Sequence, residues 1–124
     1  MIQILGDIPY DSGRFVVNLQ DGPSDAYNIA MHFSARFDDP YTGEAVVLTS
    51  KHDGGYGQEI REHHSGFPFR KGAPFEMLIL CEHNEWKVAV NGHHFAEMGH
   101  RNPFHHAGFL AVEGDVNIRS IREY

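Results

Sequence analysis

The chain has 124 residues, a length typical of one domain, and its formal net charge of −7 argues against nucleic-acid or membrane-surface partners, because both are themselves negative. Its single cysteine, Cys81, has no partner for an internal disulfide and is interpreted as a small buried hydrophobe. No apolar stretch approaches the roughly 20 residues of a membrane span and no signal peptide is recognisable, so we expect cytoplasmic synthesis, with any action outside the cell requiring an unconventional export route.

Strand-like alternation dominates the chain, and no segment has the period of an amphipathic helix. The predicted strands are residues 2–5, 14–19, 27–36, 45–50, 56–62, 75–82, 86–91, 93–98, 108–112 and 116–121. Residues 38–43 and 51–55 are interpreted as turns or loops, and Asn91-Gly92 is the strongest hairpin signal. Many short strands separated by turns predict an antiparallel sandwich or barrel, and the absence of a linker or internal repeat favours one domain.

Polar side chains are concentrated between His32 and Arg61. Strand alternation places His32 and Arg36 on the face opposite Phe33, and Tyr56 stands shortly before a carboxylate and a guanidinium. A flat ring can pack against the C–H face of a small polyhydroxylated ligand while planar charged groups reach its hydroxyls, so this stretch favours a sugar-binding site. The alternative is that these residues are simply the solvated face of a sheet.

Seven segments of the chain match one family in family order. They are GRFVVNLQDG (13–22), IAMHFSARF (29–37), VVLTS (46–50), GYGQEIRE (55–62), FPFRKGAPFEMLI (67–79), WKVAVNGHHFAEMGHR (86–101) and GDVNIRSI (114–121). With these segments the sequence resembles a galectin carbohydrate-recognition domain over nearly its whole length. The resemblance implies an all-β, two-sheet antiparallel jelly-roll-like sandwich of the galectin and concanavalin A-like lectin type, with β-galactosides bound on its concave sheet.

The resemblance also implies roles for individual residues. His32 and Arg36 match the family's HFNPR-like motif and are expected to bond the axial 4-hydroxyl of galactose. Glu59 and Arg61 match the WGxExR-like motif and are expected to bond the 6-hydroxyl and the neighbouring sugar. His100-Arg101 resembles the family's HR segment, for which we expect packing and loop hydrogen bonding.

Three positions depart from the family's binding motifs, namely Ser34, Thr49 and Tyr56. Ser34 and Thr49 stand where the family has Asn, and both lack the paired donor and acceptor of an amide. Tyr56 stands where the family has a stacking Trp and offers a flat face of smaller area. At roughly 0.5–1.5 kcal/mol per hydrogen bond, two losses weaken binding on the order of tenfold to a hundredfold.

These departures leave two functions open. The first is a lectin that binds lactose-type or N-acetyllactosamine-type glycans and glycoconjugates weakly or with altered selectivity. The alternative is a galectin-fold interaction module that has lost galactoside binding or binds a different glycan. His32 adds a pH hypothesis, because an unperturbed imidazole has a pKa near 6.5 and gains charge in mild acid.

The sequence offers little support for an enzyme or a metal site. A glycosidase needs two carboxylates roughly 5–9.5 Å apart, but Glu59 is the only carboxylate that the sequence places in the expected groove, so we expect no enzyme and no catalytic residue. Histidines form three adjacent pairs, His63-His64, His93-His94 and His105-His106. Neighbours in a strand point to opposite faces, and no metal-ligand motif is present, so no metal and no cofactor is expected.

The start of the chain raises one further expectation. Galectins usually carry a strand before the segment that begins at Ile2, and Met1 starts too late to supply it. We therefore expect residues 1–124 to form a single carbohydrate-recognition domain lacking the usual first strand, as a shortened form, a trimmed form or one repeat of a longer protein. The sheet edges that this strand covers are then exposed, which leaves the oligomeric state open.

Overall fold

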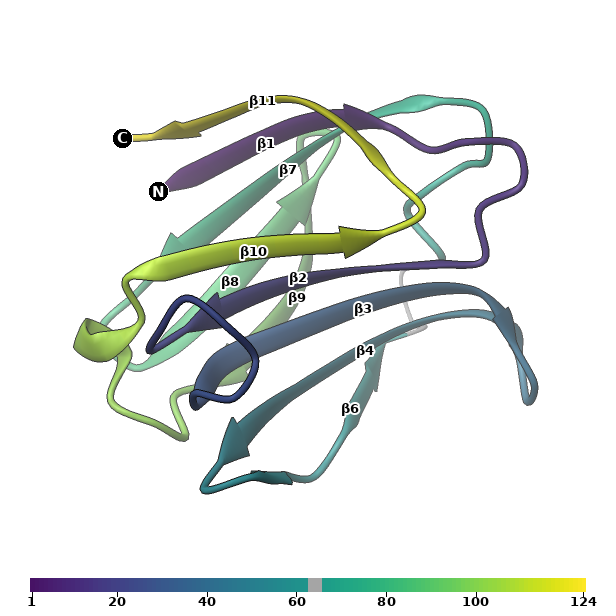
Figure 1. The fold of residues 1–124 in the computed structure, drawn as a ribbon. Coiled ribbons are helices and arrows are strands. Elements are labelled where there is room, and N and C mark those ends of the chain that lie inside the picture. The colour runs from purple at the N-terminus through teal and green to yellow at the C-terminus, as the bar shows by residue number, and fades with distance from the viewer. Residues whose placement is uncertain (63–65) are drawn as a thin grey trace.

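The computed structural model describes residues 1–62 and 66–124, which form two antiparallel sheets packed face to face (Figure 1). The strands are β1 Ile2–Asp7, β2 Arg14–Gln20, β3 Ile29–Asp39, β4 Gly43–His52, β5 Gly55–Tyr56, β6 Ile60–Glu62, β7 Pro74–Cys81, β8 Glu85–Val90, β9 His93–Gly99, β10 Phe109–Gly114 and β11 Asn117–Glu123, and a 3-10 helix, η1, spans Phe104–His106. One sheet has the order β11-β1-β7-β8-β9, and the other has the order β10-β2-β3-β4-β5 with β6 also paired to β4. The predicted two-sheet antiparallel sandwich is therefore confirmed.

The hairpin β3–β4 is longer than the sequence indicates. β3 continues to Asp39 and β4 runs from Gly43 to His52, so only short turns remain of the two predicted loops. In the second turn Asp53 and Gly54 both have positive φ, 51° and 83°, as a tight two-residue hairpin turn requires. Asn91 and Gly92 adopt the same conformation between β8 and β9, which confirms the hairpin predicted there.

The core lies between the two sheets and is built largely from alternate residues of β1, β2, β3, β4, β7, β8 and β9. Phe15 of β2 contacts the rings of Phe69 and Phe75, with ring centroids 5.1 and 5.7 Å apart. Phe69 belongs to the segment before β7 and is buried, so it anchors this segment to the core. Close packing of these rings joins the two sheets, and the opposite face of β2, β3 and β4 lies outside this core.

Cys81 is exposed, so the prediction of a buried cysteine is wrong. Alternation along β7 does place it on the same side as the buried Met77 and Ile79, but β7 extends past the end of the core at this point. The partial burial that remains raises the pKa of the Cys81 thiol. Cys81 lines a cavity of about 210 Å³ at the open end of the sandwich, together with Trp86 and Phe104.

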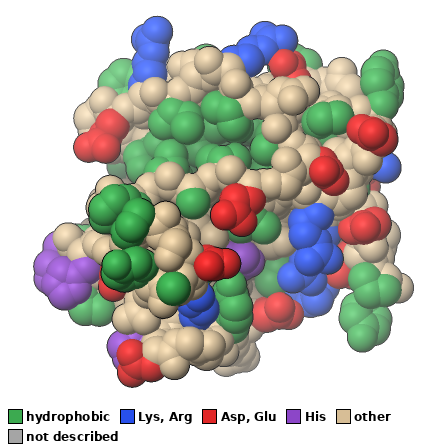
Figure 2. All heavy atoms as spheres, viewed as in Figure 1, with side chains coloured by type: hydrophobic (Ala, Val, Ile, Leu, Met, Phe, Trp, Pro, Cys, Tyr) green, Lys and Arg blue, Asp and Glu red, His purple; other side chains and the backbone are tan. Residues whose placement is uncertain are grey.

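β10 and β11 form two neighbouring edges of the sandwich. Among the described strands, β10 pairs with β2 and β11 pairs with β1, and neither pairs with the other. Ile118 and Ile121 of β11 are 37% and 48% exposed, and Figure 2 shows hydrophobic side chains at the surface between the two strands. No helix in the described part of the chain combines the length and the apolarity that crossing a membrane demands.

Candidate functional site

The outer face of β2, β3, β4 and β6 carries the residues for which the sequence predicts binding. Strand pairing sets His32 of β3 beside Asn18 of β2 and Thr49 of β4. Val47 of β4 lies between Ser34 and Arg61 in the same way. The seven predicted residues, His32, Ser34, Arg36, Thr49, Tyr56, Glu59 and Arg61, all come from β3, β4, β5, β6 and the link between the last two. In Figure 2 basic and acidic side chains gather on this face.

His32 has a fixed hydrogen bond on one ring nitrogen. Its Nδ1 lies 2.7 Å from the Oδ1 atom of Asn18, and an amide oxygen can only accept. Nδ1 therefore carries the proton and Nε2 is left as an acceptor. Burial and the nearby charge of Arg36 lower the pKa of His32 to about 4, so the ring is neutral at physiological pH and the hypothesis of titration near 6.5 is wrong.

Two guanidiniums and two carboxylates form a compact charged cluster on this face. Arg61 places its Nη1 atom 3.1 Å from Oδ1 of Asp39 and its Nη2 atom 3.5 Å from Oε1 of Glu59. Arg36 lies 3.8 Å from the same Oδ1 atom and 3.9 Å from Oε2 of Glu59. The cluster is formally neutral, and each guanidinium lies between two carboxylates, which restricts its orientation.

Asp39 is the buried member of this cluster. Its side chain has no exposed surface, whereas that of Glu59 is nearly half exposed. Burial alone would raise the pKa of Asp39, but hydrogen bonds from Arg61 and from Tyr41 and Thr42 hold that pKa at about 2. The hydrogen bond to Asp39 in turn raises the pKa of Arg61. Asp39 and Arg61 are therefore both ionised at neutral and mildly acidic pH.

Both side chains that replace a family Asn already have partners in the protein. The Oγ atom of Ser34 accepts a hydrogen bond of 3.2 Å from Nε of Arg36, and Ser34 is buried. The hydroxyl of Thr49 lies 3.0 Å from the carbonyl oxygen of Gly57 and 3.2 Å from that of Gln58. Ser34 thus orients Arg36, and Thr49 fastens the link between β5 and β6.

Tyr56 supplies an exposed aromatic wall. The residue is 57% exposed, and its ring centroid lies 5.4 Å from that of His32 at an interplanar angle of 65°. Lys51 of β4 places its Nζ atom 5.7 Å from the centre of the same ring. The two rings lie at one end of the candidate site and the charged cluster at the other, and the strip of the sheet's outer face between them is called the groove.

The segment after β9 fastens this groove to the opposite sheet. Arg101 donates to the carbonyl oxygen of Gln58 at 2.6 Å, close to the link that carries Glu59. The amide of Asn102, which is buried, lies 3.1 Å from the carbonyl oxygens of both Ile29 and Lys51. These contacts confirm the hydrogen-bonding role expected of this loop.

Sequence analysis did not identify three contributors to the site: Asn18, Asp39 and Lys51. For Asn18 a signal was present, because alternation in RFVVNL puts it on the face opposite Val17 and Leu19. Asp39 and Lys51 were assigned to predicted turns or loops. Their contributions depend on chain segments that come together only in the folded sheet.

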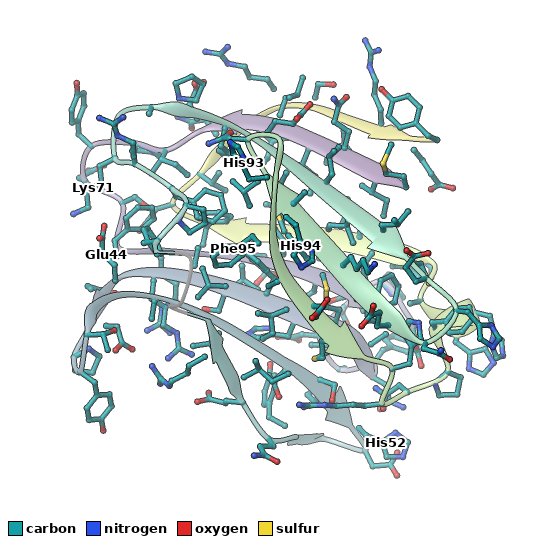
Figure 3. The ribbon with its side chains drawn as sticks, turned by 180° about the vertical axis from the view of Figure 1, so that it is seen from behind. Glu44, His52, Lys71, His93, His94 and Phe95 are labelled. Atoms are coloured by element: carbon teal, nitrogen blue, oxygen red, sulfur yellow. The ribbon has the colours of Figure 1, made fainter. Side chains whose placement is uncertain are left out.

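The histidines that the structure describes do not gather into a metal site. In the described residues no group of three His, Cys, Asp or Glu side chains is placed to hold a metal ion. Figure 3 shows His52 at the end of β4, far along the molecule from His93 and His94 on β9. The His63-His64 pair lies outside the described residues.

Comparison with known proteins adds a family and a set of relatives. Residues 1–123 match the family model described as galactoside-binding lectin. Galectin-7 of Homo sapiens is 36% identical over 122 residues, which cover 98% of this chain and 85% of that protein. Galectin-4 of Bos taurus is 42% identical over 108 residues, which cover 87% of this chain and 31% of that protein. The chain thus spans about a third of the galectin-4 relatives that it matches.

Solved structures with the same fold are also galectins. Sheep galectin-11, in a complex with glycerol, matches with a TM-score of 0.85 at 25% identity, covering 98% of this chain and 86% of that chain. Galectin LEC-6 of Caenorhabditis elegans matches with a TM-score of 0.81 at 30% identity, covering 97% of this chain and 78% of that chain.

Proposed function

The chain belongs to the galactoside-binding lectins, the galectins, and from that membership we propose that its groove binds β-galactosides of the lactose and N-acetyllactosamine type on glycans and glycoconjugates. The observation that carries the proposal is the pairing of a hydrogen-bond acceptor with a donor. His32 offers Nε2 as an acceptor, since its Nδ1 is held by Asn18, and Arg36 offers its guanidinium on the same strand face.

A single hydroxyl can use both groups at once. It donates its proton to Nε2 of His32 and accepts from Arg36 through an oxygen lone pair. The axial 4-hydroxyl of galactose stands out from the ring and fits such a pair, whereas an equatorial hydroxyl is directed along the ring plane. Selectivity for galactose is thus expected from His32 and Arg36 together.

The remaining groups suit the rest of a disaccharide. The exposed ring of Tyr56 packs against the apolar C–H face of galactose. Glu59 accepts from the 6-hydroxyl, and Arg61 donates to the neighbouring sugar. Because both side chains are already held in the charged cluster, little rotamer freedom is lost on binding.

Affinity is expected to be lower than two additional Asn side chains would give. The hydroxyls of Ser34 and Thr49 are used inside the protein, by Arg36 and by the carbonyl oxygen of Gly57. Loss of two direct hydrogen bonds corresponds to a weakening on the order of tenfold to a hundredfold. The same observation favours the second candidate, an interaction module without useful galactoside affinity.

A glycosidase fits the cluster poorly. The general acid of such an enzyme needs a raised pKa, but Asp39 has a pKa of about 2, and both of its neighbours across the cluster are guanidiniums. We therefore propose a binding protein and not an enzyme.

Calorimetric titration with lactose tests the proposal, with sucrose as the control ligand. The Arg61→Ala variant removes a groove contact, and Arg119→Ala is its matched control, because Arg119 is an exposed arginine of β11 paired with Asp7 on the other sheet. We expect saturable heat with lactose alone, lost in Arg61→Ala and kept in Arg119→Ala. No saturable heat in the folded wild-type protein overturns galactoside binding and leaves the second candidate, for which a glycan array is the next measurement.

A further inference from the structure

We propose that Asp39, whose side chain has no exposed surface, is the positioning residue that aims both groove arginines, an inference that rests on the proposed function. The two oxygens of its carboxylate contact different parts of the molecule. One oxygen is bound by the backbone turn, and the other receives the guanidiniums of Arg36 and Arg61.

Oδ2 of Asp39 is held by the turn between β3 and β4. The backbone N–H groups of Tyr41 and Thr42 donate to it at 3.2 and 3.1 Å, and the hydroxyl of Thr42 lies 3.1 Å away. Gly43, which pairs with Asp39 across the hairpin, has a φ of 80°, a conformation that glycine adopts readily. The position of the carboxylate is therefore set by the hairpin and not by the arginines.

Oδ1 points toward the groove arginines. It lies 3.1 Å from Nη1 of Arg61 and 3.8 Å from Nη1 of Arg36. Each arginine meets Glu59 through its Nη2 atom at a longer or similar distance, 3.5 Å for Arg61 and 3.9 Å for Arg36. The buried oxygen thus fixes the inner edge of each guanidinium, and the outer edge faces the groove.

This division also frees Glu59 for the ligand. Without the charge on Asp39, one exposed carboxylate faces two guanidiniums, which draw it toward themselves and repel each other. With Asp39 present the four groups are neutral in sum, so Glu59 keeps oxygen lone pairs for a ligand hydroxyl. Asp39 accordingly acts on affinity through Arg36, Glu59 and Arg61.

The variant Asp39→Asn tests this inference because it keeps the shape of the side chain. Three donors of the turn face Oδ2, so the amide oxygen is expected to stay on the turn and the amide N–H₂ to face Arg61. The amide N–H₂ of the new Asn then faces the N–H groups of Arg61, and both guanidiniums lose the carboxylate oxygen that holds them. We expect lactose affinity to fall about tenfold or more. Asp38→Asn is the matched control, because Asp38 is an exposed neighbour and the charge change is the same; it should stay within about twofold of wild type.

A second measurement separates positioning from a general effect on folding. The ¹H–¹⁵N signals of the Arg36 and Arg61 side chains are recorded without ligand in wild type, Asp39→Asn and Asp38→Asn, after melting curves establish that each is folded. We expect these signals to shift and broaden in Asp39→Asn alone. Unchanged arginine signals, or lactose affinity within about twofold of wild type in Asp39→Asn, overturn the inference. Absence of lactose binding in wild type overturns the proposed function instead, and the arginine signals still decide the role of Asp39.

Discussion

The Nδ1 atom of His32 lies 2.7 Å from Oδ1 of Asn18, on the neighbouring strand, and this contact decides what the imidazole can do. Since the amide oxygen only accepts, the tautomer is fixed with its proton on Nδ1. Burial and the charge of Arg36 lower the pKa of His32 to about 4 and keep the ring neutral. A group that resembles a pH sensor in the sequence is thus a constant acceptor in the folded protein.

Lactose affinity should therefore be independent of pH between about pH 8 and pH 5.5. The folded pKa of His32, about 4, is below the ordinary value of an imidazole. The ring therefore gains its second proton only as the pH falls toward 4, and Nε2 then becomes a donor. Asp39, with a pKa of about 2, does not titrate in this window. Titration calorimetry between pH 8 and pH 5.5 measures the lactose affinity, and NMR titration of the ring measures the pKa of His32. A decline in affinity centred near 6.5 contradicts this account.

Replacing the partner should change the tautomer and the pH response in different ways. Asn18→Ala leaves Nδ1 without its acceptor, and we expect lactose affinity to fall about tenfold as the tautomers mix. Asn18→Asp places a negative charge beside the ring, which raises the pKa of His32 and moves the loss of affinity to higher pH. ¹⁵N shifts of the ring report the tautomer. If Asn18→Asp has the same pH profile as wild type, the partner does not control His32.

Much of the fold follows from local sequence pattern. Alternation alone places Phe15 and Phe33 inside, and Asn91-Gly92 marks the hairpin between β8 and β9. The exception at Asp39 is informative, because DDPYTG has the composition of a loop and yet the strand continues. The carboxylate accepts from both N–H groups of the turn, so the strand can extend up to the turn itself.

The site was less accessible from the sequence, and for a physical reason. His32, Arg36, Glu59 and Arg61 were found through motif resemblance, which identifies residues but not their partners. Asn18 lies 14 residues from His32, and its role depends on strand pairing. The prediction for Cys81 was wrong for a different reason. Alternation shows which side of a strand a residue occupies, but it does not show where the core ends along that strand.

A larger ring at position 56 should strengthen binding. Tyr56 is more than half exposed, so the larger ring of Tyr56→Trp can extend on the solvent side and add stacking area, and we expect a several-fold gain in lactose affinity. Tyr56→Ala should abolish measurable binding. Tyr10→Trp, at another exposed tyrosine outside the groove, is the control. Equal affinities for wild type, Tyr56→Trp and Tyr56→Ala would show that the ring does not contact the sugar.

Cys81 should react with a thiol reagent in the native protein, because it is exposed. Partial burial raises the pKa of its thiol, so the thiolate is scarce at neutral pH and the reaction should be slow there. An ordinary cysteine has a pKa of about 8.5, and its reaction rate stops rising once the thiol is fully ionised. The reaction rate of Cys81 should still be rising with pH at that point, because its pKa is raised. The absorbance change on reaction with Ellman's reagent measures the rate at which the thiol reacts at each pH. Reaction only after unfolding would restore the buried interpretation.

Asn102 should matter for stability more than any exposed asparagine. Its buried amide lies 3.1 Å from the carbonyl oxygens of Ile29 and Lys51, where the pairing of β3 with β4 is irregular. Asn102→Ala leaves both carbonyls without this donor, and we expect about 1–3 kcal/mol of lost stability in urea unfolding. Asn84→Ala, in the β7–β8 turn, is the control. Because Ile29 and Lys51 flank the groove, lactose affinity should also fall, and unchanged stability with unchanged affinity would contradict the role of Asn102 as a bridge between the two strands.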